Sequence, residues 1–461
     1  MFDLNPILNT DSYKLSHWLQ YPPGAQEVSS YVESRGGAFD SILFFGLQPF
    51  LMEHLARPVT RGDVEAAQEV ASAHGLPFHR DGWFDLVARH GGALPVEISA
   101  IPEGTVLPPQ NVLAQIRNTD PAFYWLSSYL ETALLRAIWY PTTVATISYA
   151  CKQVIRRALE ETSDDPKGQL PFKLHDFGAR GVSSLESAAL GGMAHLVNFR
   201  GTDTLAALPA AKRYYDEPMA GFSIPAAEHS TITAWGRDGE ADAYANMLQK
   251  FGRRGGLVAV VSDSYDLFNA VEHIWGGVLR DQVLQMGGTL VVRPDSGHPP
   301  TIVRQTVALL ADKFGARRNA KGFFVLNPAV RVIQGDGIDV ASIGEILDEL
   351  KGAGFSADNV AFGMGGALLQ RLDRDTLRFA MKASAIRIDG QWRDIYKAPS
   401  TDPAKASKRG RLALRRGAQG FETVRAENCP AEANLLVPVW RDGQLLRRWR
   451  FSEIRERTES N

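Results

Sequence analysis

Short apolar segments that end in polar residues recur through the middle of this chain and constrain its fold more than any other feature. Thr289-Leu290-Val291-Val292 is typical of a strand buried on both faces, and the following Arg293-Pro294-Asp295-Ser296-Gly297 favours an irregular loop. The pattern predicts such strands at 173–177, 195–199, 222–225, 257–261, 289–292, 330–334, 359–362 and 379–382. Helical periodicity lies between most of them, at 183–195, 203–215, 239–251, 266–285, 300–315, 341–353 and 367–377. About eight such units is the number that closes a parallel barrel.

The two ends of the chain have a different pattern. Residues 95–101 and 112–116 are predicted to pair as antiparallel strands, and alternating polarity predicts further strands at 28–35, 385–396 and 433–451. Asp120 and Pro121 predict the start of a helix that runs to about Trp139, and Pro141 is expected to end it.

These patterns together predict an α/β protein with two domains. We expect an irregular (β/α) barrel of parallel strands at residues 149–384. Residues 1–148 and 385–461 are expected to form a second, α+β domain that contains the antiparallel strands. The length of 461 residues agrees, because it exceeds what one hydrophobic core usually organises.

Composition excludes several classes of protein. A formal net charge of −2 gives no global basic surplus for binding nucleic acid. The two cysteines, Cys151 and Cys429, are too few for a disulfide framework or a zinc cluster, and they fit a reducing cytoplasm. The N-terminal residues do not resemble a secretion signal, and no apolar run approaches the roughly 18 residues of a membrane span. We therefore expect a soluble cytoplasmic protein that binds no membrane.

Polar residues follow the predicted strands, and in a parallel barrel all of these strand ends meet at one face. Asp263, Asp295 and Asp336 follow three different strands. Carboxylates gathered in this way repel one another unless a cation or a positive transition state joins them, which indicates Mg²⁺ or a sugar oxocarbenium ion. Gly335-Asp336-Gly337 and Gly365-Gly366 leave backbone N–H groups available for a phosphate. Taken singly, each of these motifs is explained equally well as a surface turn.

Three further features each have two interpretations. Phe177 is an aromatic residue in a polar loop, so it is either a core plug at the barrel mouth or a platform for a flat ring. His229, directly after Glu228, is either a hydrogen-bonded structural residue or part of the rim of the site. The basic run at 397–411 is either a solvated loop or an attractor of polyphosphate.

Several motifs are similar to those of a known enzyme family. They are His175-Asp176-Phe177-Gly178-Ala179-Arg180-Gly181, Gly201-Thr202-Asp203-Thr204, Pro225-Ala226-Ala227-Glu228-His229-Ser230, Val261-Ser262-Asp263-Ser264-Tyr265-Asp266, Arg293-Pro294-Asp295-Ser296-Gly297 and Gln334-Gly335-Asp336-Gly337. At these positions the chain closely resembles the nicotinamide phosphoribosyltransferases, which have the type II phosphoribosyltransferase fold. The resemblance extends from residues 9–14 to residues 408–411. It implies an enzyme of NAD salvage that joins nicotinamide to 5-phosphoribosyl-1-pyrophosphate, with Mg²⁺ and ATP, as a homodimer whose active sites lie at the subunit interface.

The resemblance also implies a role for each matching residue. Nicotinamide would lie between Phe177 of one subunit and Tyr13 of the other, while Arg180 and Arg293 would hold its carbonyl side and a phosphate. Asp203 would accept a hydrogen bond from the carboxamide NH₂ group and repel the carboxylate of nicotinate.

The remaining implied roles concern the ribose, the phosphates and ATP. Asp295 would lie beside the ribose and, with Asp263, near Mg²⁺. His229, next to Glu228, resembles the histidine whose phosphorylation couples ATP hydrolysis to the reaction. The ribose 5-phosphate and hydroxyls would contact Gly335, Asp336, Gly365 and Gly366. The pyrophosphate or ATP would contact Arg35, Arg374, Lys382, Lys397 and Lys405.

Three other functions stay open on the sequence. The first is a nicotinate phosphoribosyltransferase, which a preference for nicotinate would reveal. The second is a non-catalytic binding protein on the same scaffold. The third is an unrelated sugar-phosphate barrel enzyme such as an aldolase, for which Lys382 is the candidate Schiff-base lysine.

Overall fold

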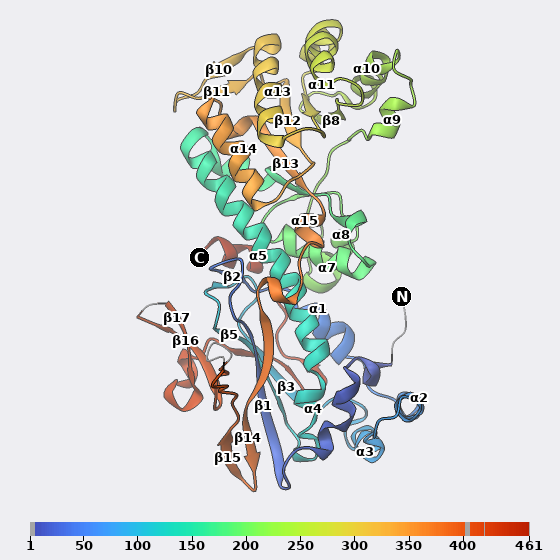
Figure 1. The fold of residues 1–461 in the computed structure, drawn as a ribbon, viewed down its shortest axis with the longest axis vertical. Coiled ribbons are helices and arrows are strands. Elements are labelled where there is room, and N and C mark those ends of the chain that lie inside the picture. The colour runs from blue at the N-terminus through green and yellow to red at the C-terminus, as the bar shows by residue number, and fades with distance from the viewer. Residues whose placement is uncertain (1–4, 402–405, 419, 461) are drawn as a thin grey trace. The chain divides into compact units, whose positions relative to one another are not determined.

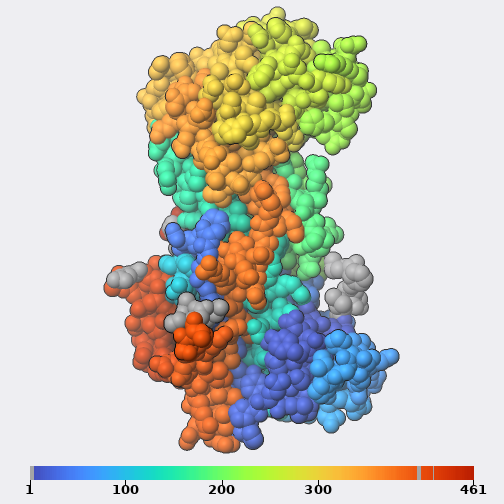
Figure 2. Space-filling view, viewed as in Figure 1, coloured from blue at the N-terminus to red at the C-terminus, as the bar shows by residue number. Residues whose placement is uncertain are grey.

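The chain folds into two compact units in the computed structural model, which describes residues 5–401, 406–418 and 420–460. The first unit comprises Met1–Thr146, Arg213–Glu217 and Asp373–Asn461, and the second comprises Ile147–Lys212 and Pro218–Leu372. In the first unit, N-terminal residues lie beside C-terminal ones, as the blue and the orange to red atoms of Figure 2 show. The prediction that both chain ends form one body therefore agrees with the observed division.

The second unit is built on a six-stranded, all-parallel sheet in the order β7-β6-β13-β12-β9-β8 (Figure 1). Its strands are β6 (Leu174–Asp176), β7 (Gly201–Thr202), β8 (Leu257–Val261), β9 (Thr289–Arg293), β12 (Val330–Gln334) and β13 (Val360–Met364). The strands predicted at 257–261 and 330–334 have the predicted limits, and the strand predicted at 289–292 extends one residue further, through Arg293. Continuous apolar sequence suits these strands because helices cover their outer faces.

Residues 222–227, which we call the seam, join the two edge strands of this sheet. Next to β7, the amide of Phe222 donates to the carbonyl of Arg200 at 2.8 Å, and the amide of Thr202 donates to the carbonyl of Phe222 at 3.0 Å. Next to β8, the amide of Ala259 donates to the carbonyl of Pro225, and the amide of Ala227 donates to the carbonyl of Ala259, both at 2.9 Å. The seam thus completes the ring of the predicted barrel, although it pairs only through isolated bridges.

Small apolar side chains fill the inside of the ring. Ala259, Val291 and Ile333 are buried there, each from a different strand. The partly buried side chains that pack on them are Phe177, Ile224 and Ala361. Phe177 therefore covers an apolar layer, as the core-plug interpretation requires.

Helices follow most of the strands, and most lie at the positions that the sequence predicts. The helix predicted at 367–377 is wrong, because only Gly366–Leu369 is α-helical there and a 3-10 turn follows at Arg374–Thr376. Ser184 caps α7 by accepting the amide of Ser187, and Asp339 forms a capping box with Ser342 at the start of α14. The helices of this unit are α6 (Pro166–Gln169), α7 (Leu185–Leu196), α8 (Ala207–Tyr215), α9 (His229–Thr233), α10 (Glu240–Phe251), α11 (Leu267–Asn269), α12 (Arg280–Gln285), α13 (Pro299–Phe314), α14 (Val340–Gly352) and α15 (Gly366–Leu369). A small antiparallel pair, β10 (Ala316–Arg318) and β11 (Phe324–Leu326), follows α13.

The first unit contains a seven-stranded antiparallel sheet in the order β15-β14-β1-β5-β3-β18-β19. Its strands are β1 (Ala25–Ser34), β3 (Val96–Ala100), β5 (Val112–Asn118), β14 (Phe379–Ile388), β15 (Gln391–Asp394), β18 (Val437–Arg441) and β19 (Gln444–Leu445). The predicted pairing of 95–101 with 112–116 is confirmed as β3 with β5. The other strands are β2 (Ile42–Leu43) with β4 (Val106–Leu107), and β16 (Leu412–Gly417) with β17 (Gly420–Arg425).

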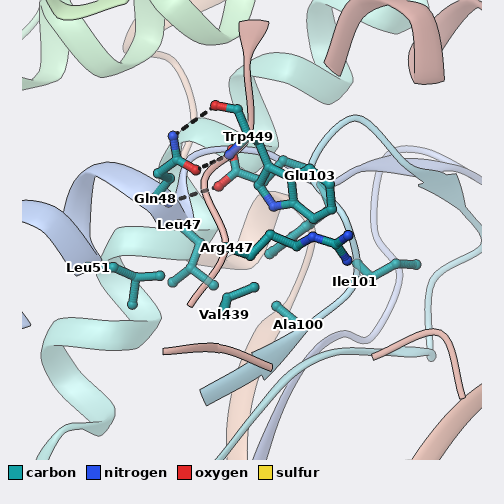
Figure 3. A pocket seen from close by; sticks show the side chains of 10 residues that line it. Leu47, Gln48, Leu51, Ala100, Ile101, Glu103, Val439, Arg447 and Trp449 are labelled. Atoms are coloured by element: carbon teal, nitrogen blue, oxygen red, sulfur yellow. Dashed lines mark hydrogen bonds between the residues drawn. The ribbon is translucent and has the colours of Figure 1, made fainter. Parts of the chain in front are cut away.

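Short helices complete the first unit. They are α1 (Leu47–Phe50), α2 (Arg61–Ala73), α3 (Arg80–His90), α4 (Leu126–Tyr129) and α16 (Phe451–Glu459), while α5 (Glu131–Thr162) supplies residues to both units. A buried carboxylate holds the start of α1 (Figure 3). Glu103 accepts the amides of Gly46 and Gln48 at 2.9 and 2.8 Å, and the hydroxyl of Tyr215 at 2.7 Å. The cavity beside it has a volume of about 10 Å³, room for about one water molecule, so we assign it to the packing of this unit.

Two predicted strands are wrong in place or in partner. The run 195–199 begins inside α7, because the ring of His195 is buried between the hydroxyl of Ser148 at 3.0 Å and the carbonyl of Gly201 at 3.1 Å. The strand predicted at 379–382 belongs to β14, which pairs antiparallel with β1 and not with the barrel. The compact units accordingly divide after residues 146 and 372, whereas the predicted limits were 148 and 384.

The helix predicted to end at Pro141 continues through it. Asp120 and Pro121 begin only a 3-10 turn, and α5 then runs from Glu131 to Thr162 with Pro141 inside. Beside the proline, the hydroxyl of Thr143 donates to the carbonyl of Trp139 at 2.6 Å. Buried packing and side-chain hydrogen bonds thus offset a cost of about 3 kcal/mol for an internal proline.

Candidate active site

The residues predicted at strand ends lie at one end of the parallel sheet. Met364 pairs with Asp176, and Asp176 with Thr202, so β13, β6 and β7 end at the same level. Val261 likewise pairs with Arg293 at the ends of β8 and β9. The following residues therefore share this face: Phe177 after β6, Asp203 after β7, Asp263 after β8, Asp295 after β9, Asp336 after β12 and Gly365 after β13.

A chain of polar contacts crosses the ends of β8 and β9. Nε2 of His229 lies 3.0 Å from Oδ1 of Asp263, whose Oδ2 accepts the amide of Asp295 at 3.1 Å. The carboxylate of Asp295 is in turn held by two guanidinium nitrogens of Arg293, at 2.8 to 3.0 Å. The side chain of His229 is 48% exposed while that of Asp263 is 4% exposed, so the carboxylate orients an accessible imidazole.

Phe177 lies against the same guanidinium. The guanidinium carbon of Arg293 is 5.5 Å from the centre of the Phe177 ring, a cation–π distance. Glycine at position 363 makes room for this ring, because a Cβ there would lie 1.9 Å from its Cε2 atom. The amide of Phe177 also donates to the carbonyl of Met364 at 2.9 Å. Backbone and packing together hold the ring at the mouth of the barrel.

Asp203 is exposed beyond the end of β7. Its Oδ1 accepts the hydroxyl of Ser223, in the seam, at 2.5 Å, and its amide donates to the carbonyl of Asp176 at 2.9 Å. The buried carboxylate of Asp176 accepts the amide of Gly178 at 2.7 Å, and burial raises its pKa. These hydrogen bonds hold together the loops that follow β6 and β7.

His175 lies on β6, and its ring lies near that of Phe177. Burial lowers the pKa of His175 to about 4. Its ring packs over Gly201, where a Cβ would lie 2.7 Å from it. This imidazole is therefore neutral at physiological pH.

Four of the predicted ligand-binding residues in this unit are exposed or half-buried: Arg180 in a 3-10 turn, Asp336 and Gly365 on loops, and Gly366 at the start of α15. Glu228 is the N-cap of α9 and accepts the hydroxyl of Ser230. Glu228 therefore caps the start of α9, directly before His229.

Asp263 and Asp295, the predicted Mg²⁺ residues, contact protein groups in this structure. Their oxygens are occupied by His229, by a backbone amide and by Arg293. In the described part of the chain, no group of three or more His, Cys, Asp or Glu side chains could hold a metal ion. The arrangement suits the orientation of side chains more than the binding of a bare cation.

The first unit has a cavity of its own of about 420 Å³, lined by residues that include Tyr13 and Lys382. The buried ammonium of Lys14, which the sequence analysis missed, pairs there with Glu131. Glu131 also lies 3.8 Å from Lys382, and burial lowers the pKa of Lys382. Two lysines and one carboxylate give the cavity a cationic surplus that suits an anion.

The other basic residues predicted to bind phosphates lie in different settings. Arg35 donates to Glu33 at 3.0 Å, Arg374 is exposed, and Lys397 lies on an exposed loop. Lys405 lies outside the described residues. Because Lys382 is on β14 of the antiparallel sheet, it is not at the end of a barrel strand, and the aldolase alternative loses its candidate.

Comparison with known proteins identifies the class. Residues 172–433 match the model of the nicotinate phosphoribosyltransferase (NAPRTase) family, and residues 5–98 match the nicotinamide phosphoribosyltransferase N-terminal domain. A parallel ring with acidic and glycine-rich strand ends is, in this light, the architecture of a phosphoribosyltransferase, an enzyme that transfers a pentose phosphate. The chain belongs to the nicotinate phosphoribosyltransferase family.

One relative is similar over its whole length. A protein of Xanthomonas campestris pv. campestris named nicotinamide phosphoribosyltransferase is 56% identical over 462 residues, which cover 99% of this chain and 98% of that protein.

Two solved structures share the fold at low sequence identity. Nicotinate-nucleotide pyrophosphorylase from Pyrococcus furiosus has a TM-score of 0.62 at 17% identity, and covers 100% of this chain and 96% of its own. Human nicotinic acid phosphoribosyltransferase has a TM-score of 0.57 at 18% identity, with 98% and 93% covered. In the described residues, no helix is both long and apolar enough to cross a membrane.

Proposed function

We propose that this protein is a nicotinamide phosphoribosyltransferase. It transfers the 5-phosphoribosyl group of 5-phosphoribosyl-1-pyrophosphate to nicotinamide, giving nicotinamide mononucleotide and pyrophosphate. The observation that carries the proposal is the carboxylate of Asp203, exposed at the barrel end that also bears Phe177. Such a carboxylate accepts the NH₂ of a carboxamide and repels a second carboxylate, which favours nicotinamide over nicotinate by several kcal/mol in a desolvated site. The 56% identity to the Xanthomonas protein supports the same substrate.

The chemistry is a displacement at the anomeric carbon of the ribose. The ring nitrogen of nicotinamide forms a bond to this carbon while the bond to the pyrophosphate oxygen breaks, through an oxocarbenium-like state. Phe177 stacks on the pyridine ring, and Arg180 and Arg293 hold the carbonyl side and a phosphate. Asp295, held by Arg293, lies beside the cationic ribose. The ribose 5-phosphate and hydroxyls contact Gly335, Asp336, Gly365 and Gly366.

ATP, Mg²⁺ and a second subunit complete the proposal. ATP would transfer its γ-phosphoryl group to His229, with ADP leaving, and the accessible ring held by Asp263 supports this role. Mg²⁺ would enter with the pyrophosphate of the substrate, since hard cations prefer phosphate oxygens. In a homodimer, the exposed ring of Tyr13 would stack on nicotinamide held by the partner subunit. Arg35, Arg374, Lys382, Lys397 and Lys405 would contact pyrophosphate or ATP. A cytoplasmic location stays a prediction.

Steady-state kinetics with both bases test the substrate. The wild-type enzyme, with 5-phosphoribosyl-1-pyrophosphate, ATP and Mg²⁺, should have a higher kcat/KM for nicotinamide than for nicotinate. Asp203→Asn should lower that preference by about tenfold or more, because the charge that repels nicotinate is gone while the shape is kept. Arg280→Gln, on α12 and outside the proposed site, should leave the preference unchanged.

The second candidate is a nicotinate phosphoribosyltransferase, which the description of the matching family model favours. A wild-type preference for nicotinate, unaffected by Asp203→Asn, would establish that function and exclude the role given to Asp203. Absence of either mononucleotide product would exclude both.

A further inference from the structure

Ser223 makes a hydrogen bond to Asp203 that has no role in the reaction proposed above. This residue is the second of the seam, and its hydroxyl donates to Oδ1 of Asp203 at 2.5 Å. In the described part of the chain, no other hydrogen bond to a side-chain oxygen of Asp203 is seen. The pair thus uses one carboxylate oxygen and leaves Oδ2 available to a ligand.

Backbone hydrogen bonds fix both members of this pair. The amide of Asp203 donates to the carbonyl of Asp176, and the neighbouring Thr202 donates to the carbonyl of Phe222, directly before Ser223. The distances are 2.9 and 3.0 Å. Because the seam is registered against the end of β7, Ser223 and Asp203 meet through the sheet itself and not through a chance rotamer.

Without such a partner, an exposed aspartate changes its χ1 rotamer, and its carboxylate plane turns broadly about χ2. The hydroxyl restricts the plane of the Asp203 carboxylate and so directs Oδ2, which lowers the entropy lost when a carboxamide binds. It also occupies the oxygen that a misoriented amide would otherwise use. The contribution is made through Asp203, so Ser223 is a positioning residue and not a catalytic one.

We propose that Ser223 sets the base specificity of this enzyme by holding Asp203 in the orientation that accepts the carboxamide of nicotinamide. The inference rests on the proposed function, because it deepens the role given to Asp203. It assigns part of the preference for an amide over an acid to a residue of the seam, outside the six strands of the sheet.

The test compares Ser223→Ala with Ser223→Thr. Ser223→Ala should raise the KM for nicotinamide about fivefold to tenfold with kcat within about twofold, because the lost hydrogen bond acts on the base only through the orientation of Asp203. The KM for nicotinate should fall or stay unchanged, so the preference falls by at least the same factor. Ser223→Thr keeps the hydroxyl and should restore both values to within about twofold of wild type.

Ser184→Ala serves as the matched control. Ser184 caps α7 and should lower the melting temperature when truncated, yet it should leave the base preference unchanged. If Ser223→Ala instead reduces kcat/KM equally for both bases along with the melting temperature, its role is structural and the inference is overturned.

Two further outcomes separate the inference from the function on which it rests. A wild type active on nicotinamide whose Ser223→Ala variant keeps its KM and preference overturns the inference alone. A wild type without turnover on nicotinamide overturns the proposed function and the inference with it.

Discussion

The close contact between Gly363 and Phe177 gives the sharpest test of how the barrel mouth is built. Gly363→Ala adds one methyl group whose carbon would lie 1.9, 2.2 and 2.7 Å from three atoms of the Phe177 ring. These distances are far below van der Waals contact, so the ring must move or β13 must shift. Overpacking of this kind costs about 1–3 kcal/mol. If Phe177 stacks on the base, the KM for nicotinamide should also rise by about fivefold or more.

Urea unfolding and steady-state kinetics measure the two effects. Gly344→Ala, inside α14, is the control, because its new Cβ would lie 3.8 Å from the side chain of Val154, an ordinary contact. This substitution should stabilise the helix by about 0.5–1 kcal/mol. In a Phe177→Ala background, the ring that the new methyl group would meet is absent. Gly363→Ala should then lower the unfolding free energy by less than about 0.5 kcal/mol.

The reasoning fails if Gly363→Ala is as stable as the wild type. It also fails if the cost is the same with and without the Phe177 ring, because the strain would then lie elsewhere. A loss of stability with an unchanged KM for nicotinamide would support the packing of Gly363 against Phe177. It would also contradict the proposal that Phe177 stacks on nicotinamide.

Two further predictions concern buried groups. His175 has a pKa of about 4 in the fold and about 6.5 when unfolded, so the folded state binds fewer protons between these values and stability falls as the pH falls through that window. Urea unfolding should show a loss of about 2 kcal/mol from this group between pH 7 and pH 5, which His175→Gln should remove; an unchanged pH dependence would contradict the burial of a neutral ring. Tyr215→Phe removes a donor to the buried Glu103 and should lower the unfolding free energy by about 2 kcal/mol, whereas Tyr396→Phe, on the surface, should change it by less than about 0.5 kcal/mol.

The sequence predicted those parts of the fold whose signal is local. β8, β9 and β12 are short, largely apolar runs between turns, and their limits are found as predicted to within one residue. β7 has only two residues, Gly201 and Thr202, so periodicity had nothing to detect, and the more apolar run before it was taken for the strand. The continuation of α5 past Pro141 depends on tertiary packing, which overrides the local signal.

The residues of the candidate site also divide into those with a local sequence signal and those without one. Residues such as Asp263 and Asp295 were predicted because each directly follows a recognisable strand. The contact between Ser223 and Asp203 joins residues 20 apart in sequence and depends on the register of the seam, for which no local pattern exists. Lys14 was missed because a lysine near the N-terminus is usually solvated, and only its burial beside the half-buried Glu131 distinguishes it.

Isolated bridges hold the seam, whereas paired strands hold the rest of the ring, so the seam has the fewest backbone contacts of a regular sheet. Ile224 of the seam packs on the layered interior, whereas Ser223 is exposed. A substitution of Ser223 should therefore cost less folding stability than one of a buried strand residue. Under the role proposed for Ser223, the preferred base is thus adjustable at a segment separate from the strand ends that we propose bind phosphate.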